Sequence, residues 1–182
     1  MLKINLGAGF EKVPNFINID VSDHCRPDYV LDIEKDRLPF DDNSVDEVVC
    51  HHILEHLGDG FFHAIKEIYR VCVNDAIIHI RVPHPRHDVQ MIDPTHKRFI
   101  YPETIAMFSQ ARNKKDIERG GSETPLGIIN NVDIDVVSVN YILDPNFKKI
   151  FEGLSNDQCE MIVRTQNNVV LEIIMKAVVI KS

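Results

Sequence analysis

The stretch Ile4–Asp20, INLGAGFEKVPNFINID, contains the features that decide the fold. An apolar run is followed by two glycines around Ala8, a short polar segment with one proline, and a second apolar run that ends in Asp20. Short apolar runs separated by Gly and Pro are typical of buried strands joined by turns. Ten residues separate Gly9 from Asp20. This is too few for a full crossover helix, so we expect a loop or one helical turn there.

Strand-like and helix-like segments alternate along the rest of the chain. We expect strands at 2–6, 15–20, 29–33, 45–52, 74–83 and 132–143, and helices at 58–72, 101–111 and 145–154. We also expect an irregular loop over 83–98, a mobile polar loop over 112–127, and one or two strands within 159–182. The alternation predicts an α/β protein with a Rossmann-like, doubly wound, mostly parallel sheet and an antiparallel C-terminal edge strand.

The composition predicts one domain over residues 1–182, because 182 residues with 44% hydrophobic content suffice for one packed core. The net charge of −8, with no basic cluster longer than Lys114–Lys115, disfavours nucleic acid as a partner. We find no apolar stretch long enough to span a membrane and no signal-peptide pattern. The four cysteines show no CxxC pairing. We therefore expect a cytoplasmic protein with reduced thiols, away from membranes, as a monomer or homodimer.

Two glycines and two acids follow the predicted strands at positions that suit a nucleoside. In open α/β sheets, ligands bind beyond the carboxyl ends of the strands, where the connections reverse direction. Gly7 and Gly9 follow the first strand and allow a tight turn with close approach of a ligand. Asp20, at the end of the second strand, is placed to accept hydrogen bonds from ribose hydroxyls. Asp32, after the third strand, is a candidate for the adenine amino group, with the Ile33 N–H offered to the ring.

Four segments together resemble the class I S-adenosylmethionine-dependent methyltransferases, in particular small enzymes of the methyltransferase type 11 kind. They are INLGAG (4–9), INID (17–20), VLDIEKDRLPFDDNSVDEVVCHHILEHL (30–57) and EIYRVCVNDAIIHIRVPHP (67–85). The resemblance covers residues 3–110, and its most specific part runs from LPFDDNSVDEVV to LEH.

The resemblance implies S-adenosylmethionine as the cofactor. The glycine loop would hold the methionine part of the cofactor, the acid after the second strand the ribose, and the acid after the third strand the adenine. The first residues beyond the fourth strand would face the methionine end. The expected cofactor-binding residues are Leu6, Gly7, Ala8, Gly9, Asp20, Val21, Asp32, Ile33, Cys50 and His51.

Histidines after the fourth and fifth strands are the candidates for the chemistry. Methyl transfer from a sulfonium is an in-line displacement that requires alignment and, for alcohols, phenols and carbon acids, a base. A histidine oriented by an aspartate suits that role, for example His87 with Asp88 or Asp93, or His96 with Asp93. The candidate catalytic residues are His84, His87, Asp93 and His96. The candidate acceptor-binding residues are His56, Arg86, Lys97 and Arg98, because Arg and Lys would bind an anionic acceptor.

Structural roles compete with several of these assignments. His56, together with Glu55, is an alternative orienting element for its loop, His52 suits a packing or capping role, and Asp93 suits the cap of a turn. A metal site is a further alternative. His84, His87, Asp88, Asp93 and His96 are five potential ligands within thirteen residues. Their spacing fits no specific motif, so we expect no metal.

The sequence thus predicts methyl transfer from S-adenosylmethionine to a small-molecule acceptor, polar or anionic, with residues 84–127 as an acceptor pocket and lid. One alternative is a non-catalytic module that binds S-adenosylmethionine or S-adenosylhomocysteine. Another is a methyltransferase acting on a protein or nucleic acid. A dehydrogenase is disfavoured because the GxGxxG fingerprint and a second half-fold are both missing.

Overall fold

A seven-stranded sheet forms the centre of the computed structural model, which describes residues 1–181. The strands are β1 (Leu2–Leu6), β2 (Ile17–Asp20), β3 (Tyr29–Val30), β4 (Val45–His51), β5 (Cys72–Pro83), β6 (Ile134–Leu143) and β7 (Val170–Val179). Their order is β3-β2-β1-β4-β5-β7-β6. Strands β1 to β5 pair in parallel, and β7 runs antiparallel between β5 and β6. The predicted Rossmann-like sheet with an antiparallel C-terminal part is confirmed.

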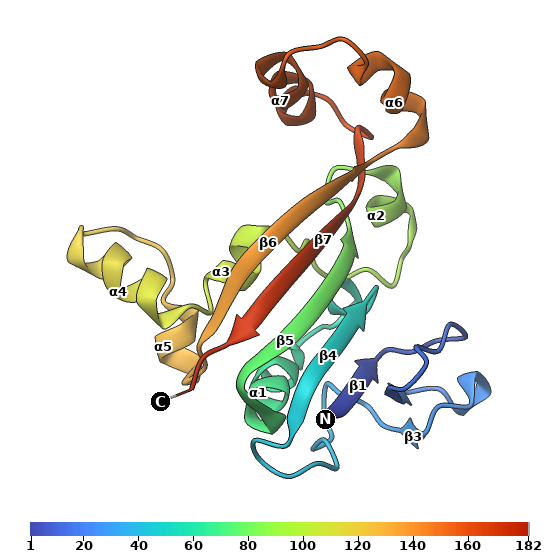
Figure 1. Cartoon of the computed structure of the whole chain (residues 1–182), viewed down its shortest axis with the longest axis vertical. Coiled ribbons are helices and arrows are strands. Elements are labelled where there is room, and N and C mark those ends of the chain that lie inside the picture. Colours follow the sequence, from blue (N-terminus) through green and yellow to red (C-terminus); the bar gives the residue numbers. More distant parts are fainter. Residues whose placement is uncertain (182) are drawn as a thin grey trace.

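Most helices belong to the C-terminal half of the chain (Figure 1). They are α1 (Phe61–Val71), α2 (Asp88–Ile92), α3 (Pro102–Ala106), α4 (Gln110–Glu118), α5 (Leu126–Asn130), α6 (Pro145–Phe151) and α7 (Asn156–Thr165). Two short 3-10 turns, η1 (Asp23–Cys25) and η2 (Leu54–His56), follow β2 and β4. Within the described residues, every helix is too short or too polar to span a bilayer.

The hydrophobic core lies between one face of the sheet and α1. Phe61, Ile65 and Ile68 of α1 recur at helical spacing and are at most 4% exposed. They pack in the same cluster as Val48 of β4 and Ile80 of β5. Burial of each such side chain stabilises the fold by about 1.5–3 kcal/mol. The helix is therefore held against the sheet by its apolar stripe, and it fixes the carboxyl end of β4 where the site begins.

The opposite face of the sheet is polar. The connections from β1 to β2 and from β2 to β3 contain no α-helix within residues 1–181, so nothing in them covers this face. Lys3, Glu47 and His79 on neighbouring strands form a row, with Glu47 2.5 Å from the Lys3 Nζ and 2.8 Å from the His79 Nε2. This alternation of apolar and polar residues is typical of a sheet with one solvated face, and it is unusual for parallel strands.

The prediction of a mobile loop over 112–127 is wrong, and so is the prediction of one helix over 101–111. Helix α3 ends at Ala106, and a new helix, α4, begins at Gln110. Ser109 caps α4 by accepting the Arg112 N–H at 3.2 Å. Helix α4 continues to Glu118. The Oδ1 of Asn113, which is 1% exposed, accepts the Gly127 N–H at 2.9 Å and so ties α4 to α5. Long-range hydrogen bonds thus order a segment whose polar composition predicted a loop.

Two further segments differ from the prediction. Residues 83–98 contain the short helix α2, capped by His87, which accepts the Val89 N–H at 3.1 Å. Part of the predicted strand region at 159–182 belongs to α7, which begins with a reciprocal capping box between Ser155 and Gln158. In both cases a local capping interaction begins a helix in a polar segment. The apolar residues of such a segment show little helical periodicity, so the sequence did not predict the helix.

The two ends of the sheet receive different segments (Figure 1). Helices α4 and α5 lie toward the end where β6 begins. There the Gln110 N–H donates a hydrogen bond to the carboxylate of Asp133, in the turn before β6, at 2.9 Å. Helices α6 and α7 extend beyond the carboxyl end of β6, and α2 lies beside the carboxyl end of β5. Residues 84–101, α6 and α7 therefore border the carboxyl edge of the parallel strands, whereas most of the predicted lid over 84–127 lies elsewhere.

Candidate active site

The glycine loop after β1 is a tight turn held against β2. Gly7 and Gly9 both have positive φ, at 64° and 53°. Between them, the Ala8 N–H donates to the Ile19 carbonyl at 3.0 Å. A Cβ on Gly7 would lie 2.7 Å from the Cβ of Ile53, whereas one on Gly9 would meet nothing within 4 Å. Gly7 is thus required both for its conformation and for the close approach of the loop after β4.

Asp20 orders this loop from the end of β2. One carboxylate oxygen accepts the Gly9 N–H at 2.8 Å, and the other accepts the Ser22 N–H at 2.9 Å. An ionised carboxylate has about four acceptor positions, so it retains capacity for the hydroxyls of a ligand. Asp20 therefore stabilises the turn and at the same time presents a carboxylate with free acceptor positions at the edge of the sheet.

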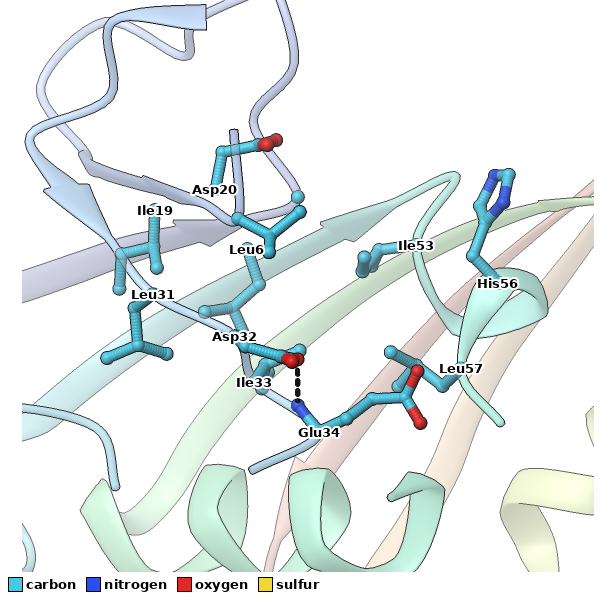
Figure 2. Close-up of a pocket in the computed structure, with 12 residues that line it drawn as sticks. Leu6, Ile19, Asp20, Leu31, Asp32, Ile33, Glu34, Ile53, His56 and Leu57 are labelled. Atoms are coloured by element: carbon cyan, nitrogen blue, oxygen red, sulfur yellow. Dashed lines mark hydrogen bonds between the residues drawn. The ribbon is translucent and has the colours of Figure 1, made fainter. Parts of the chain in front are cut away.

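An apolar pocket opens between the ends of β1, β2 and β3 (Figure 2). Its floor and walls are formed by Leu6, Ile19, Leu31, Ile33, Ile53 and Leu57. The lining is completed by Gly7, Asp20, Val21, Asp32, Glu34 and His56. Apolar walls with a few polar groups at the rim are typical of sites for flat heterocycles attached to a polar sugar.

Asp32 and Glu34 fix the far wall of the apolar pocket. The Lys35 ammonium, 2.6 Å from Asp32, is the main cause that lowers the pKa of this carboxyl. Asp32 also accepts the Glu34 N–H at 3.0 Å, the bond drawn in Figure 2. Glu34 in turn accepts the N–H groups of Gly58 and Gly60, at 2.9 and 3.0 Å. These bonds link the end of β3 to the start of α1 and keep the pocket open between them.

A second hollow lies on the other side of the glycine loop. It is lined by Asn5, Gly7, Ala8, Gly9, Phe10, Glu11, Val13, His51 and His52. His51 is exposed at the end of β4 and lines this hollow. Cys50 is not available in this way, because its side chain is 0% exposed in the core, and burial raises the pKa of its thiol. Cys50 therefore has only its backbone to offer a ligand.

His87 is occupied by structural contacts. Its Nδ1 accepts the Val89 N–H at the start of α2, so its Nε2 carries the proton and donates to Asp144 at 3.2 Å. The predicted pairing of His87 with Asp88 or Asp93 is therefore wrong. His84 is also buried, its Nδ1 accepts the Arg86 N–H at 3.2 Å, and burial lowers its pKa to about 4. His84 is therefore poorly suited to take a proton at neutral pH, and both ring nitrogens of His87 are already engaged in hydrogen bonds.

The predicted anion-binding side chains are engaged elsewhere. The guanidinium of Arg86 donates to the carbonyls of Val163 and Arg164 at the end of α7, which it caps. The guanidinium of Arg98 donates to the Leu57 carbonyl at 2.9 Å and lies over the Phe61 ring. Lys97 is the more exposed of the three, and its ammonium lies 3.8 Å from Glu34 at the apolar pocket. Both arginines therefore stabilise the loops of the site, and their predicted role in binding an anionic acceptor stays a prediction.

His56 and His96 do come together, as two edge-to-face rings with centroids 4.6 Å apart. The Thr95 hydroxyl donates to Asp93 at 2.6 Å, so it accepts the Nδ1–H of His56 at 2.9 Å. Asp93 also accepts the Thr95 N–H at 2.8 Å, as expected of a turn cap. Its carboxylate is 3.7 Å from the His96 Nε2, so the predicted pair is close but not hydrogen-bonded.

The sequence singled out HHILEHL but missed the roles of Glu55 and His52 within it. Glu55 is 0% exposed, and His52 has a positive φ of 52°. His52 bridges two acids, with Nδ1 3.4 Å from Glu55 and Nε2 3.1 Å from Glu172. An acidic residue inside an otherwise apolar turn was the available signal for Glu55. Glu172 comes from β7 and has no signal near it in the sequence.

Comparisons with known proteins agree with this geometry. Residues 9–80 match the family model of the methyltransferase domain. No curated protein sequence matches the chain significantly.

Several solved structures share the fold. One is a SAM-dependent methyltransferase from Archaeoglobus fulgidus, with a TM-score of 0.64 and 16% identity over 97% of this chain and 85% of that one. Another is a SAM-dependent methyltransferase from Mesorhizobium loti, with a TM-score of 0.52 and 14% identity over 97% and 90% of the two chains. The YcgJ protein from Bacillus subtilis aligns with a TM-score of 0.55 and 16% identity over 99% and 92%.

The glycine loop, the acid after β2 and the apolar pocket lie at the reversal of strand order beside β1, where open α/β sheets bind their ligands. Over residues 9–80 the chain is thus similar to the methyltransferase domain, and its fold is that of S-adenosylmethionine-dependent methyltransferases of known structure.

Proposed function

We propose that this enzyme transfers the methyl group of S-adenosylmethionine to a small polar acceptor at the carboxyl edge of the sheet. The observation that carries this proposal is the position of Asp20, whose carboxylate braces the glycine loop and also lines the apolar pocket. A nucleoside in that pocket would have its ribose hydroxyls at Asp20 and its base among the apolar side chains. The methionine part would then extend along the glycine loop toward His51.

The assignment of residues to the cofactor follows from the two hollows that meet at Gly7. We assign the ribose to Asp20, with Val21 beside it, and the adenine to the apolar walls and the Ile33 backbone. Asp32 is held by Lys35, so it would act through one remaining acceptor position. We assign binding of the methionine part to the glycine loop, the Cys50 backbone and His51.

The acceptor side is assigned to the segment that follows β5 and to η2. His56 lines the apolar pocket, and His96 is packed against it. Because Arg86 and Arg98 are already bonded to backbone carbonyls, a polar acceptor is better supported than an anionic one. The pocket would be bounded by residues 84–101 and by α6 and α7, rather than by 84–127.

Methyl transfer requires the acceptor atom in line with the carbon–sulfur bond and shielded from water. The attacking atom forms a bond to the methyl carbon as the electron pair of the carbon–sulfur bond returns to sulfur. The product of the cofactor is then the neutral thioether S-adenosylhomocysteine. The histidine-rich rim would orient an acceptor with a hydroxyl or another polar donor atom. A hydroxyl acceptor would release its proton at this rim as its oxygen binds the methyl carbon.

Calorimetric titration with S-adenosylmethionine, S-adenosylhomocysteine and NAD tests the cofactor assignment. We expect one site, micromolar affinity for the first two compounds, and no binding of NAD. Turnover is then measured as release of S-adenosylhomocysteine with panels of small alcohols, acids, amines and thiols, and with cell protein and RNA fractions. Turnover confined to the protein or RNA fractions would overturn the small acceptor, and absence of cofactor binding would overturn the whole assignment.

A further inference from the structure

A buried carboxylate without hydrogen-bond partners lies beside the proposed acceptor pocket. Glu55, in η2, is 0% exposed, and neither of its side-chain oxygens accepts a hydrogen bond from the described residues. An isolated ionised carboxylate is costly to bury, and native structures pair such groups with hydrogen-bond donors, opposite charges or metal ions. The position of Glu55 therefore requires a partner.

The backbone brings His96 to this carboxylate. The carbonyl of Glu55 accepts the N–H groups of Lys97 and Arg98, at 2.8 and 3.1 Å. These two bonds fix the segment after α2 against η2. As a result, Glu55, His56 and His96 each offer one ligand atom, and these atoms lie within 4.8 Å of one another. The three side chains come from two segments separated by the whole of α1 and β5.

Both histidines have their Nδ1 engaged, which leaves Nε2 as the unprotonated nitrogen. His56 donates its Nδ1–H to Thr95, whose hydroxyl is itself directed to Asp93. His96 donates its Nδ1–H to the Gln90 carbonyl at 2.9 Å. A metal-binding histidine almost always donates its other ring N–H to a carboxylate, a carbonyl or a similar acceptor. The tautomers set by Thr95 and Gln90 are thus the ones a metal ion requires.

We propose that Glu55, His56 and His96 bind a divalent transition-metal ion. Two imidazoles and one carboxylate are a ligand set typical of zinc, iron, manganese or nickel, whereas calcium and magnesium prefer oxygen ligands. Thr95, with Asp93 behind it, and the Gln90 carbonyl would form the supporting layer of hydrogen bonds. The ion would also supply the positive charge that the buried Glu55 needs.

His52 is the competing partner for Glu55. Its Nδ1 is 3.4 Å from a Glu55 oxygen, while its Nε2 contacts Glu172 at 3.1 Å. A protonated His52 would partly neutralise Glu55 without a metal, although the contact does not reach hydrogen-bond geometry. This arrangement leaves the matching tautomers of His56 and His96 unexplained, and the metal site accounts for all three residues together.

Three protein ligands leave the ion at least one open position. His56 lines the apolar pocket that we assign to the cofactor, so the open position would lie beside the cofactor, and we assign it to an oxygen or nitrogen atom of the acceptor. This consequence rests on the proposed function, whereas the metal site itself does not. It narrows the acceptor to molecules with a donor atom that can bind a metal, such as a hydroxyl or carboxyl group.

The test uses the full chain, stripped with EDTA and exchanged into chelator-free buffer. Cobalt(II) is titrated with visible absorption as the readout, and zinc is titrated by calorimetry without cofactor. We expect one ion per chain, with cobalt bands that zinc abolishes. Glu55→Gln and His96→Ala should each weaken binding at least tenfold. Thr95→Val, which keeps all three ligands, should weaken it by about 10- to 100-fold. His24→Asn, at an exposed histidine that is not one of the three ligands, is the matched control and should bind as the wild type does.

Circular dichroism and thermal unfolding verify that each variant is folded. If a variant of a ligand residue does not fold, Thr95→Val still tests the site, because it keeps all three ligands. Equal metal affinity in the wild type, Glu55→Gln and Thr95→Val would overturn the site, as would the absence of any stoichiometric binding. S-adenosylhomocysteine affinity of the metal-free protein is measured separately. Cofactor binding without metal binding would refute this inference alone, and metal binding without cofactor binding would refute only the proposed function.

Discussion

The substitution Asp20→Asn tests the link between the glycine loop and the cofactor most directly. Asparagine preserves the size of the side chain but removes its charge, and it replaces one acceptor oxygen with a donor. Asp20 now accepts the Gly9 and Ser22 N–H groups at 2.8 and 2.9 Å, so one of these donors loses its partner. Since the position is partly exposed, water can replace that bond in the free protein, and we expect the fold to persist.

We expect the substitution to weaken cofactor binding more than it lowers the stability of the fold. A hydrogen bond to a charged group contributes about 1.5–3 kcal/mol, and the ribose would lose at least one such bond. At about 1.4 kcal/mol per factor of ten, the dissociation constant should rise by roughly 10- to 150-fold. Asp20→Ala should weaken binding further, because both loop contacts disappear together with the contact to the ribose.

Calorimetry with S-adenosylhomocysteine measures the affinity, and thermal unfolding measures the stability of each variant. Asp23→Asn is the matched control, because Asp23 lies three residues away on η1 with its side chain 81% exposed. It makes the same chemical change outside the pocket and should leave the affinity unchanged. A folded Asp20→Asn variant that binds within twofold of the wild type would show that the ribose lies elsewhere.

Three further predictions concern the turn, the thiols and a buried histidine. Gly7→Ala should lower the free energy of unfolding by more than 1 kcal/mol, measured in denaturant, because the new Cβ would clash with Ile53 at a residue with positive φ. Gly9→Ala, which has positive φ but no clash, should lower it by about 1 kcal/mol or less. Equal losses in the two variants would refute the role of the clash. A thiol reagent should label two cysteines in the native protein and four in urea, because Cys50 and one other thiol are buried; rapid native labelling of all four would contradict this. The pKa of His84 lies below that of an unfolded histidine, near 6.5, so its contribution to stability is present above pH 6.5 and is lost as the pH falls toward 4. His84→Asn should therefore unfold with a shallower pH dependence between 6.5 and 4, and an unchanged slope would refute the assignment.

The strands and the helix of the N-terminal half were predictable because their signals are local. LKINL, INID and the Val-rich segment at β4 are continuous apolar runs, and α1 carries an apolar stripe at helical spacing. Helices α4 and α7 were not predicted, because polar surface helices have weak periodicity and depend on caps such as Ser109 and Ser155. Residues 112–127 looked mobile for the same reason, although Asn113 fastens them to α5.

The candidate site divides in a similar way. The glycine loop, Asp20 and Asp32 were predictable from the sequence, because each lies at or just beyond the carboxyl end of a strand, and parallel strands bring these ends to one edge. The contacts of the histidines and arginines, by contrast, depend on tertiary packing. His87 donates a hydrogen bond to Asp144, and Arg86 donates to carbonyls at the end of α7. His96 lies near Glu55, with their potential ligand atoms within 4.8 Å of each other. These partners lie far apart in the chain, and long flexible side chains pair with whichever charged or polar group the packing brings near them. A short sequence motif does not encode that choice, because it is made by the relative placement of η2, β5 and the segments beyond β6.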